Sequence, residues 1–436
     1  VIIEKPTRKS PNRLLGLSPY TSDAKLFGKG MSNHLVVRSG WSDLDTFLTY
    51  RASHIFTHHQ HYDAGHFTVF KGAPLLVDAA QYNGSVMSAR RLNIDIRTLS
   101  KNSLLVQQPN EYVQPNFHFA ESISDGGQRI VMPTGSAITS VDHWQQLRDK
   151  DMHLGATDLM EYSHRPGAYT AISSDLTSAY NSTRYTTSGN LAKVKQVFRH
   201  LVYINNIDTL ICYDRILSTN SNYQTKWLGH SVNRPIASPL TLHKGTVSDG
   251  ITRALTNQLL LKNKQSTLRL DILSPRDAIT QIVGGERYQH YVETDADDSS
   301  LNGRFYAEGF KKRAWYDQGK WRFEFSPLQQ KQLTRFVISM QPRIDKEMLP
   351  VVALKGNESG ATIGSLLVLW PNEQKIWKFN AANETRQIGV FLDKQSSLEI
   401  VINGNKLAKT ISSKVGFNMI ELAIMDNDSV TISQLR

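Results

Sequence analysis

Residues 67–78 read FTVFKGAPLLVD, and this stretch decides how the chain must fold. Apolar residues stand on both sides of a four-residue segment, Lys71-Gly72-Ala73-Pro74. Apolar, aromatic and β-branched runs joined by a short segment with Gly are typical of a β-hairpin. The stretch therefore predicts two antiparallel strands, over residues 67–70 and 75–78, with a loop over residues 71–74.

The same pattern recurs further along the chain. A strand-like run, WRFEF, follows the turn residues 317–320, and another, over 398–402, precedes Asn403-Gly404. Helical periodicity is weak, and residues 141–151 are the best short candidate for a helix. Many short strands separated by turn residues are typical of β-sandwich layers. We therefore expect an all-β protein, with a large antiparallel β-sandwich followed by a smaller β domain.

The length of 436 residues exceeds that of one ordinary domain. Residues 1–32 are polar and irregular, and the run 336–340 is followed by Gln341-Pro342-Arg343. We expect a lead-in linker over residues 1–32, a β-sandwich domain over 33–341 and a small C-terminal β domain over 342–436. The first residues have no starting Met and no apolar signal-peptide core, as at the start of a processed chain or an excised fragment.

Composition limits the class of protein. Hydrophobic residues make up 40% and charged residues 20%, which is ordinary for a globular chain. The sequence has no apolar run long enough for a membrane-spanning helix. Cys212 is the single cysteine, so an internal disulfide and a thiolate metal cluster are excluded. Its apolar neighbours predict a buried, unreactive thiol.

The net charge of +11 favours a polyanionic partner, such as nucleic acid, anionic lipid or acidic polysaccharide. Lysines and arginines are scattered along the chain and are not collected in one tail. Nucleic acid is not favoured, because the sequence has no zinc-finger spacing, phosphate loop or RNA-binding signature. A merely solvated basic surface is the alternative.

Four of the fourteen histidines fall within residues 58–66, directly before the predicted hairpin. Imidazole is the usual neutral metal ligand and the usual proton carrier near neutral pH. On an extended strand His59 and His61 would point the same way. The pattern indicates half of a metal site or half of an acid–base site; a few surface histidines and one core histidine are the alternative.

Segments spread over about residues 35–340 resemble, in the same order, the β-sandwich part of the heparinase II/III-like polysaccharide lyases. The segments that carry the resemblance are 38–41 (RSGW), 50–51 (YR), 59–67 (HQHYDAGHF), 76–78 (LVD), 97–106, 125–129 (DGGQR), 169–180, 194–199 (VKQVFR), 213–215 (YDR) and 227–231 (WLGHS). An ordered series of this kind is more specific than the histidine motif alone.

The resemblance implies a large antiparallel β-sandwich of the supersandwich type and a small β domain, which in the family follow a helical α/α-toroid. This chain matches the β portion, and the toroid is not in it. Members of the family cleave uronic-acid polysaccharides by β-elimination, and their catalytic tyrosine comes largely from the helical part. We expect a polysaccharide lyase, or its β part, that acts on a glycosaminoglycan or alginate type of polymer and needs the helical part of the same enzyme. Periplasmic or secreted localisation fits such a substrate.

β-Elimination removes the proton next to a carboxylate and expels the glycosidic oxygen, so it needs an acid, a base and a group that neutralises the carboxylate. The resemblance implies that His59 faces the substrate as base or neutralising group; an orienting or buried role is the alternative. Tyr82 and Arg97 are further catalytic candidates, although Tyr82 could equally pack in the core or at the rim.

Arg51 and Arg129 are candidates for substrate binding, because guanidinium matches carboxylate and sulfate groups. For each arginine alone, a structural ion pair is the alternative. Trp227 and His230 are expected to pack.

The resemblance also implies a zinc site that uses His61 and Asp78. Many family members have a third histidine where this chain has Lys101, so His118 is the next candidate ligand. Two imidazoles and a carboxylate suit Zn²⁺, which would be structural, with another divalent metal or no tightly bound metal as alternatives. A plain hairpin leaves His61 far from Asp78, so the chain must bend near Ala64-Gly65 for the two to meet.

Two other classes of function are open. One is a non-catalytic protein that binds polyanionic carbohydrate through a basic face of the sandwich. The other is a structural subunit that depends on a separate helical chain for activity. Elimination creates an unsaturated uronate that absorbs ultraviolet light, and this product distinguishes the lyase from both.

Overall fold

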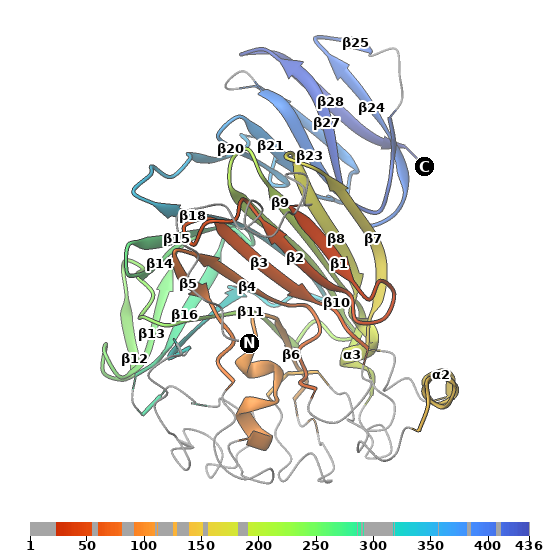
Figure 1. Ribbon diagram of the computed structural model, residues 1–436. Helices are drawn as coiled ribbons and strands as arrows, with labels where there is room; N and C mark the ends of the chain where they lie inside the picture. The colour runs from red at the N-terminus through yellow and green to blue at the C-terminus, as the bar shows by residue number, and fades with distance from the viewer. Residues whose placement is uncertain are drawn as a thin grey trace.

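The computed structural model describes residues 23–54, 60–80, 91–109, 111, 125–128, 139–150, 156–181, 191–285, 287–288, 291, 317, 319–355, 357–381, 385–406 and 411–435. Within these residues the protein is built almost entirely of β-strands, which form stacked sheets and a separate pair of sheets at one end (Figure 1). The expected all-β class is confirmed. None of the helices in the described part of the chain has the length and apolar character that a membrane crossing requires.

The N-terminal sheet is a five-stranded antiparallel meander in which each strand pairs with the next. Its strands are β1 (Ala24–Phe27), β2 (His34–Arg38), β3 (Thr46–Arg51), β4 (His66–Lys71) and β5 (Ala73–Leu76). Alternate residues of β3 are buried, as expected when one face of a sheet packs on a core. Strand β1 forms within the stretch that was expected to be a lead-in linker.

The hairpin predicted over residues 67–78 is present as β4 and β5, but its loop is shorter than predicted. Lys71 pairs with Ala73, so the chain reverses at Gly72, whose φ is +65°. A side chain at Gly72 would lie 2.7 Å from Ile344 of the neighbouring sheet, so close packing as well as backbone geometry requires glycine here. The tight turn leaves Asp78 just beyond the end of β5.

Two larger antiparallel sheets follow, one of seven strands and one of six. The seven-stranded sheet contains β14 (Gln258–Asn263), β15 (Ser266–Ser274), β18 (Leu333–Ile344), β10 (Thr209–Ser218), β9 (Val194–Ile204), β8 (Tyr169–Asp175) and β7 (Asp158–Arg165). The six-stranded sheet contains β12 (Thr241–Gly245), β13 (Gly250–Leu255), β16 (Ala278–Gly284), β17 (Trp321–Pro327), β11 (Gln224–Ser231) and β6 (Leu104–Gln107). Both share one apolar core with the N-terminal sheet.

Aromatic packing joins the N-terminal sheet to the six-stranded sheet. Trp227 on β11 is fully buried, as expected, and its ring lies 6.0 Å from that of Phe67 on β4. The same indole stacks on Phe325 of β17 at 5.5 Å. Burial of large aromatic side chains supplies much of the hydrophobic stabilisation of a core.

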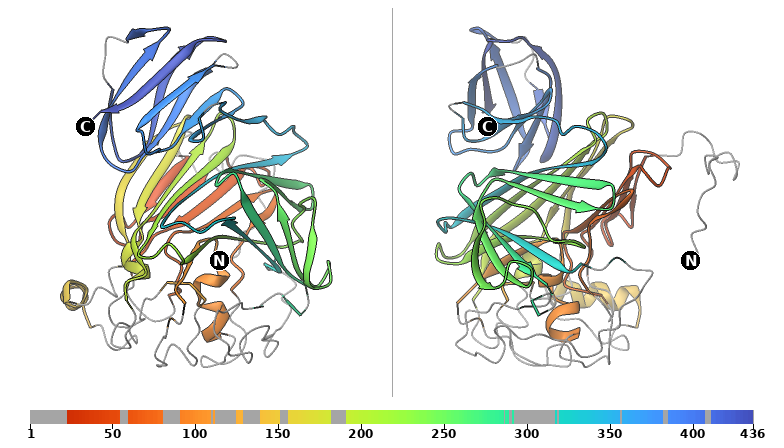
Figure 2. Two further views of the ribbon diagram at one scale, coloured as in Figure 1. Left: turned by 180° about the vertical axis from the view of Figure 1, so that it is seen from behind. Right: turned by 90° about the vertical axis from the view of Figure 1, so that its left-hand side faces the viewer.

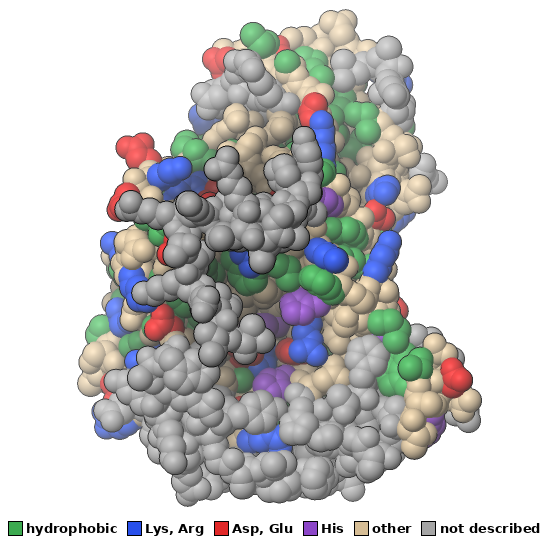
Figure 3. All heavy atoms as spheres, in the orientation of Figure 1, with side chains coloured by type: hydrophobic (Ala, Val, Ile, Leu, Met, Phe, Trp, Pro, Cys, Tyr) green, Lys and Arg blue, Asp and Glu red, His purple; other side chains and the backbone are tan. Residues whose placement is uncertain are grey.

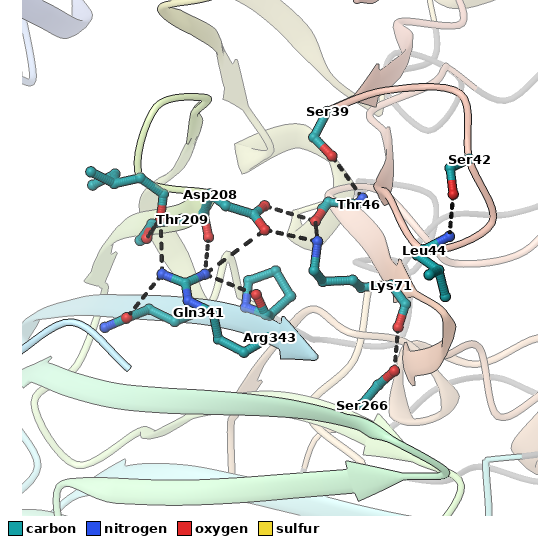
Figure 4. A network of polar contacts seen from close by, with 12 residues as sticks. Ser39, Ser42, Leu44, Thr46, Lys71, Asp208, Thr209, Ser266, Gln341 and Arg343 are labelled. Carbon is teal, nitrogen blue, oxygen red and sulfur yellow. Dashed lines mark hydrogen bonds and ion pairs between the residues drawn. The ribbon is translucent and has the colours of Figure 1, made fainter. Parts of the chain in front are cut away.

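Polar contacts join the N-terminal sheet to the seven-stranded sheet (Figure 4). Asp208, in the turn between β9 and β10, accepts a hydrogen bond of 2.7 Å from Thr46 of β3. Its other carboxylate oxygen lies 3.0 Å from the ammonium group of Lys71 on β4. Arg343 of β18 donates to the Asp208 carbonyl at 2.7 Å. These bonds fix the position of β3 and β4, and therefore of the residues at their ends.

The C-terminal part consists of two further sheets and lies at one end of the molecule (Figure 2). One contains β19 (Val351–Ala353), β20 (Gly360–Ile363), β21 (Leu366–Leu369), β23 (Thr385–Leu392) and β27 (Gly416–Ile424). The other contains β22 (Ile376–Asn380), β28 (Ser429–Leu435), β24 (Ser396–Ile402), β25 (Asn405–Lys406) and β26 (Ile411–Ser413). The hairpin predicted at 398–405 is confirmed, with Asn403 and Gly404 both at positive φ. The boundary proposed at 341/342 stays a prediction, although β18 continues to Ile344.

The helices are short. They are η1 (Arg91–Asp95, a π-helix), η2 (Thr98–Ser100, a 3₁₀ turn), α2 (Val141–Lys150) and α3 (Thr177–Tyr180). Helix α2 confirms the candidate at 141–151.

The expectation of a buried Cys212 is also confirmed, because its side chain is inaccessible on β10 and burial raises the pKa of the thiol.

Candidate functional site

A buried polar segment between η2 and β6 brings the candidate site together. Lys101, Asn102 and Ser103 are each 0% exposed. Buried polar groups are stable only when their hydrogen bonds are satisfied, so this segment must be held by specific partners. Its partners come from the N-terminal sheet and from β11.

Asn102 is the centre of these bonds. Its amide nitrogen donates to the carbonyl oxygens of Phe67 at 2.7 Å and Val77 at 3.1 Å. Its amide oxygen accepts from the backbone N–H of His230 at 2.8 Å, and its own N–H donates to Nδ1 of His66 at 2.9 Å. One asparagine therefore connects the loop that carries Lys101 to three places: strand β4, strand β11 and the segment that follows β5.

The ammonium group of Lys101 lies between His61 and Asp78. Its Nζ is 2.8 and 2.9 Å from the two carboxylate oxygens of Asp78 and 2.8 Å from Nδ1 of His61. An ammonium group only donates, so Nδ1 of His61 accepts and its Nε2 carries the hydrogen. The Lys101 side chain is inaccessible, whereas that of Asp78 is 32% exposed.

The electrostatics of this cluster favour an ion pair and a neutral imidazole. Burial and the charge of Lys101 lower the pKa of His61 to about 2. Burial alone would raise the pKa of Asp78, but Lys101 and His66 together lower it to about 2. At neutral pH the site therefore holds a carboxylate, an ammonium group and an uncharged His61.

The bend predicted near Ala64-Gly65 is present and explains how His61 reaches Asp78. Gly65 has φ of +80°, and the backbone N–H and carbonyl of Ala64 both bond to the amide of Gln128. A side chain at Gly65 would lie 2.6 Å from Leu176, so glycine is needed here. The chain turns away from β4 at this point, so His61 lies outside the regular strand on which it was expected.

Arg51 and His34 form the more open part of the site. Arg51 ends β3, its side chain is 35% exposed, and its NH1 lies 3.4 Å from the carboxylate of Asp63. His34 pairs with Arg51 across β2 and β3, and burial and the charge of Arg51 lower the pKa of His34. Figure 3 shows histidine and Lys or Arg side chains next to one another on the face of the molecule that carries this sheet.

Arg97 lies in a different environment from the one expected of a catalytic group. Arg97 is 4% exposed, and its guanidinium forms a two-pronged ion pair with Asp125, with contacts of 2.9 and 2.7 Å. Thr98, next to it, donates to the carbonyl of Tyr62 at 2.9 Å. This is the structural ion pair that was the alternative interpretation of Arg97. Together with the bond from Thr98, the Arg97 contact with the ring of Tyr62 supports the chain directly after His61.

The structure thus brings together His61, Asp78 and, nearby, Arg51. His59, Tyr82, His118 and Arg129 lie outside the described residues. His230 is 3% exposed on β11, as its predicted packing role requires.

Sequence reasoning missed three residues of the cluster: Asn102, Asp63 and His66. Lys101 could be noticed from the sequence because it occupies the position at which many members of the resembling family have a third histidine. A polar run such as Lys101-Asn102-Ser103 otherwise resembles a surface loop.

The zinc implied by the resemblance does not fit this arrangement of the described residues. Lys101 already donates to Nδ1 of His61 and to both oxygens of Asp78, so these three acceptor atoms are taken up by an ammonium group. Within the ranges that the structure describes, no group of three or more His, Cys, Asp or Glu side chains is placed to hold a metal ion.

No protein-family model and no curated protein matches this sequence. Among solved structures, the chain is similar to a heparan sulfate lyase from Pedobacter heparinus, with 11% identity and a TM-score of 0.48, over 91% of this chain and 43% of that one. It is similar to a heparinase III, with 11% identity and a TM-score of 0.44 over the same shares. It is also similar to a galactose 1-epimerase from Lactobacillus acidophilus NCFM, with 7% identity and a TM-score of 0.37, over 75% of this chain and 99% of that one. The chain spans less than half the length of the heparan sulfate lyase and heparinase III chains.

Proposed function

We propose that this chain is the β part of a polysaccharide lyase that cleaves an acidic, uronate-containing polysaccharide, of the glycosaminoglycan or alginate type, by β-elimination. The observation that carries the proposal is the combination of a partly exposed cation with two imidazoles. The positive charge of Arg51 acts electrostatically on both His34 and His61 and contributes to lowering the pKa of each imidazole. The site therefore offers positive charge and neutral N–H donors at one place on the surface.

This combination suits the chemistry of elimination. As the proton next to the uronate carboxylate leaves, negative charge accumulates on that carboxylate, and a cation there stabilises it. Arg51 would neutralise the carboxylate, and His61, whose Nε2 carries the hydrogen, would act as an uncharged donor. The electrons of the broken C–H bond form a C=C bond while the glycosidic C–O bond breaks and its oxygen takes up a proton. His59 and Tyr82 are proposed as the groups that move these protons, and Arg129 as a second substrate contact.

The proposal includes a helical α/α-toroid part of the same enzyme, which completes the acid–base set. We also propose a periplasmic or extracellular localisation, which fits a polymeric, acidic substrate. Both statements rest on the lyase proposal.

Ultraviolet absorbance of the unsaturated product tests the proposal. The polypeptide to which this chain belongs, in full, is incubated with heparin, heparan sulfate, chondroitin sulfate and alginate. We expect absorbance to rise on at least one polymer, and the rate to fall about 100-fold or more in Arg51→Ala, because the developing charge loses its counter-ion. Arg165→Ala removes an equally basic but distant side chain and should leave the rate unchanged. No absorbance on any uronate polymer would contradict the lyase function.

The net charge of +11 favours a second candidate, a non-catalytic protein that binds polyanionic carbohydrate. Retention on a heparin column that weakens with salt, together with no ultraviolet product on any polymer, would select this function. Salt should weaken retention because exposed charges are screened.

A further inference from the structure

We infer that the ammonium group of Lys101 takes the place of a divalent metal in this chain, so that the cross-link between His61 and Asp78 is made by a side chain and needs no metal ion. The inference concerns what holds His61 and Asp78 together, and it does not rest on the proposed function. It rests on three features of the cluster: its geometry, its charge and the immobility of Lys101.

The geometry is that of a cation with three acceptors. Nζ of Lys101 donates to Nδ1 of His61 and to both carboxylate oxygens of Asp78, at 2.8 to 2.9 Å. A zinc ion would bind an imidazole nitrogen and a carboxylate oxygen at about 2.0–2.2 Å. The same atoms would need to move about 0.7 Å closer to reach a metal at the position of Nζ. The ammonium group therefore makes the contacts that a metal would make, at hydrogen-bond lengths.

The charges also balance without a metal. The ammonium group of Lys101 and the carboxylate of Asp78 form an ion pair at 2.8 Å, and their charges cancel. A divalent ion at this place would meet the ammonium group at short range, where like charges repel strongly in a buried environment. The metal could enter only if the ammonium group left.

Lys101 cannot leave easily. Its side chain is 0% exposed, and the next residue, Asn102, is anchored to Phe67, Val77, His66 and His230. Asn102 also accepts a bond of 3.0 Å from Arg199 through its carbonyl oxygen. The backbone that carries the ammonium group is thus held by β4, β11 and β9, so Lys101 is a fixed part of the site.

The cross-link also positions His61. Because Nδ1 accepts from Lys101, the hydrogen is held on Nε2, which is the tautomer that metal binding at Nδ1 would also select. Lys101 is therefore a positioning residue that sets the orientation and tautomer of His61 without a metal.

Metal content and thermal stability test the inference on the intact chain. Purified without added metal, the protein should contain no stoichiometric transition metal, and its Tm should be the same with and without a chelator. In Lys101→His, three ligands would stand together, so we expect binding of about one zinc per chain and a Tm that rises with zinc and falls with chelator. In Lys101→Met the carboxylate loses its counter-ion, so Tm should fall and zinc should not restore it.

Lys193 provides the matched control. It is also 0% exposed, and its ammonium group lies 3.4 Å from the carboxylate of Glu111. Lys193→His should lose stability without gaining zinc dependence. NMR of the His61 ring gives a second readout, since Lys101→Met should change the tautomer equilibrium while Lys193→Met should not.

Stoichiometric zinc in the natural protein, with a loss of Tm in chelator, would overturn the inference. If Lys101→His fails to fold, the metal content and chelator response of the natural protein still decide the question. None of these measurements depends on lyase activity.

Discussion

At the scale of the residue, the site depends on polar side chains that are fully buried. Arg199 on β9 shows how they are held. Its guanidinium forms a two-pronged pair with Asp214 at 2.7 and 2.8 Å, and it also donates to the carbonyl of Gly65 at 2.6 Å. One ion pair therefore supports both the bend before β4 and the loop of Asn102. Because neither partner is exposed, each is stable only while the other is present.

Asp214→Asn tests this dependence. The substitution leaves the buried guanidinium of Arg199 without its counter-charge, and we expect a loss of about 3–5 kcal/mol in the free energy of unfolding. Chemical denaturation measures it. Glu421→Gln is the control, because its pair with Arg165 is 57% exposed on both sides and should contribute no more than about 1 kcal/mol. Equal losses in the two variants would contradict the interpretation.

At the scale of the element, neighbouring strands are joined by charged side chains as well as by their backbones. Glu324 on β17 contacts Lys226 on β11 at 2.9 Å and Arg322 on its own strand at 2.7 Å. Gln281 on β16 donates to the same carboxylate at 3.3 Å. Three adjacent strands of the six-stranded sheet thus meet at one buried carboxylate.

The pairing gives a pH dependence with a definite sign. Burial would raise the pKa of Glu324, but Lys226 and Arg322 lower it from 4.5 to about 2. A carboxyl group whose pKa is lower in the folded state stabilises the fold above its unfolded pKa, and that contribution is lost as pH falls toward the folded value. The stability difference between the natural chain and Glu324→Gln should therefore be constant above about pH 5 and shrink between about pH 4.5 and 2.

Urea denaturation at a series of pH values measures this difference. Asp426→Asn, a change at an exposed carboxyl group, serves as the control. A difference that stays constant down to pH 2 would contradict the assignment.

The elements also show how far local sequence reasoning reaches. The strand at residues 398–402 and the helix at 141–150 follow from patterns of a few residues. The bend at Gly65 was expected because the resemblance pairs His61 with Asp78. The loop of the hairpin between β4 and β5 was predicted too long. Gly72 adopts a positive φ and faces Ile344 and Ser266 of the seven-stranded sheet, so packing against that sheet favours the tighter turn.

At the scale of the whole molecule, the C-terminal sheets pack on the seven-stranded sheet through an apolar and aromatic interface. Phe391 on β23 lies 5.3 Å from the ring of Tyr213 on β10 and 5.1 Å from that of Phe417 on β27. Tyr213 also donates to Asp393 at 2.7 Å. The two parts of the chain are therefore expected to unfold together.

Phe391→Ala tests this coupling. Loss of a fully buried ring should cost about 3–5 kcal/mol, and calorimetry should show the C-terminal part unfolding separately at a lower temperature. Val352→Ala, at a position that is 52% exposed, should leave one transition at nearly the same temperature. A single, equally lowered transition in Phe391→Ala would show that the two parts still unfold together without this ring, and would contradict its role in the coupling.

The sequence by itself determined the β class, the main turns, the short helix, the buried thiol and the segment that holds the site. These features depend on local periodicity and on turn residues, and both can be recognised within a short stretch of sequence. The resemblance to the lyase family also implied that His61 and Asp78 belong together. Only the tertiary structure shows that the ammonium group of Lys101 lies between these two side chains. The burial of Lys101 results from bonds between Asn102 and strands far away in the sequence, and a surface loop and a buried polar loop can have the same composition. The fold therefore places an ammonium group at the point where the resemblance implied a metal.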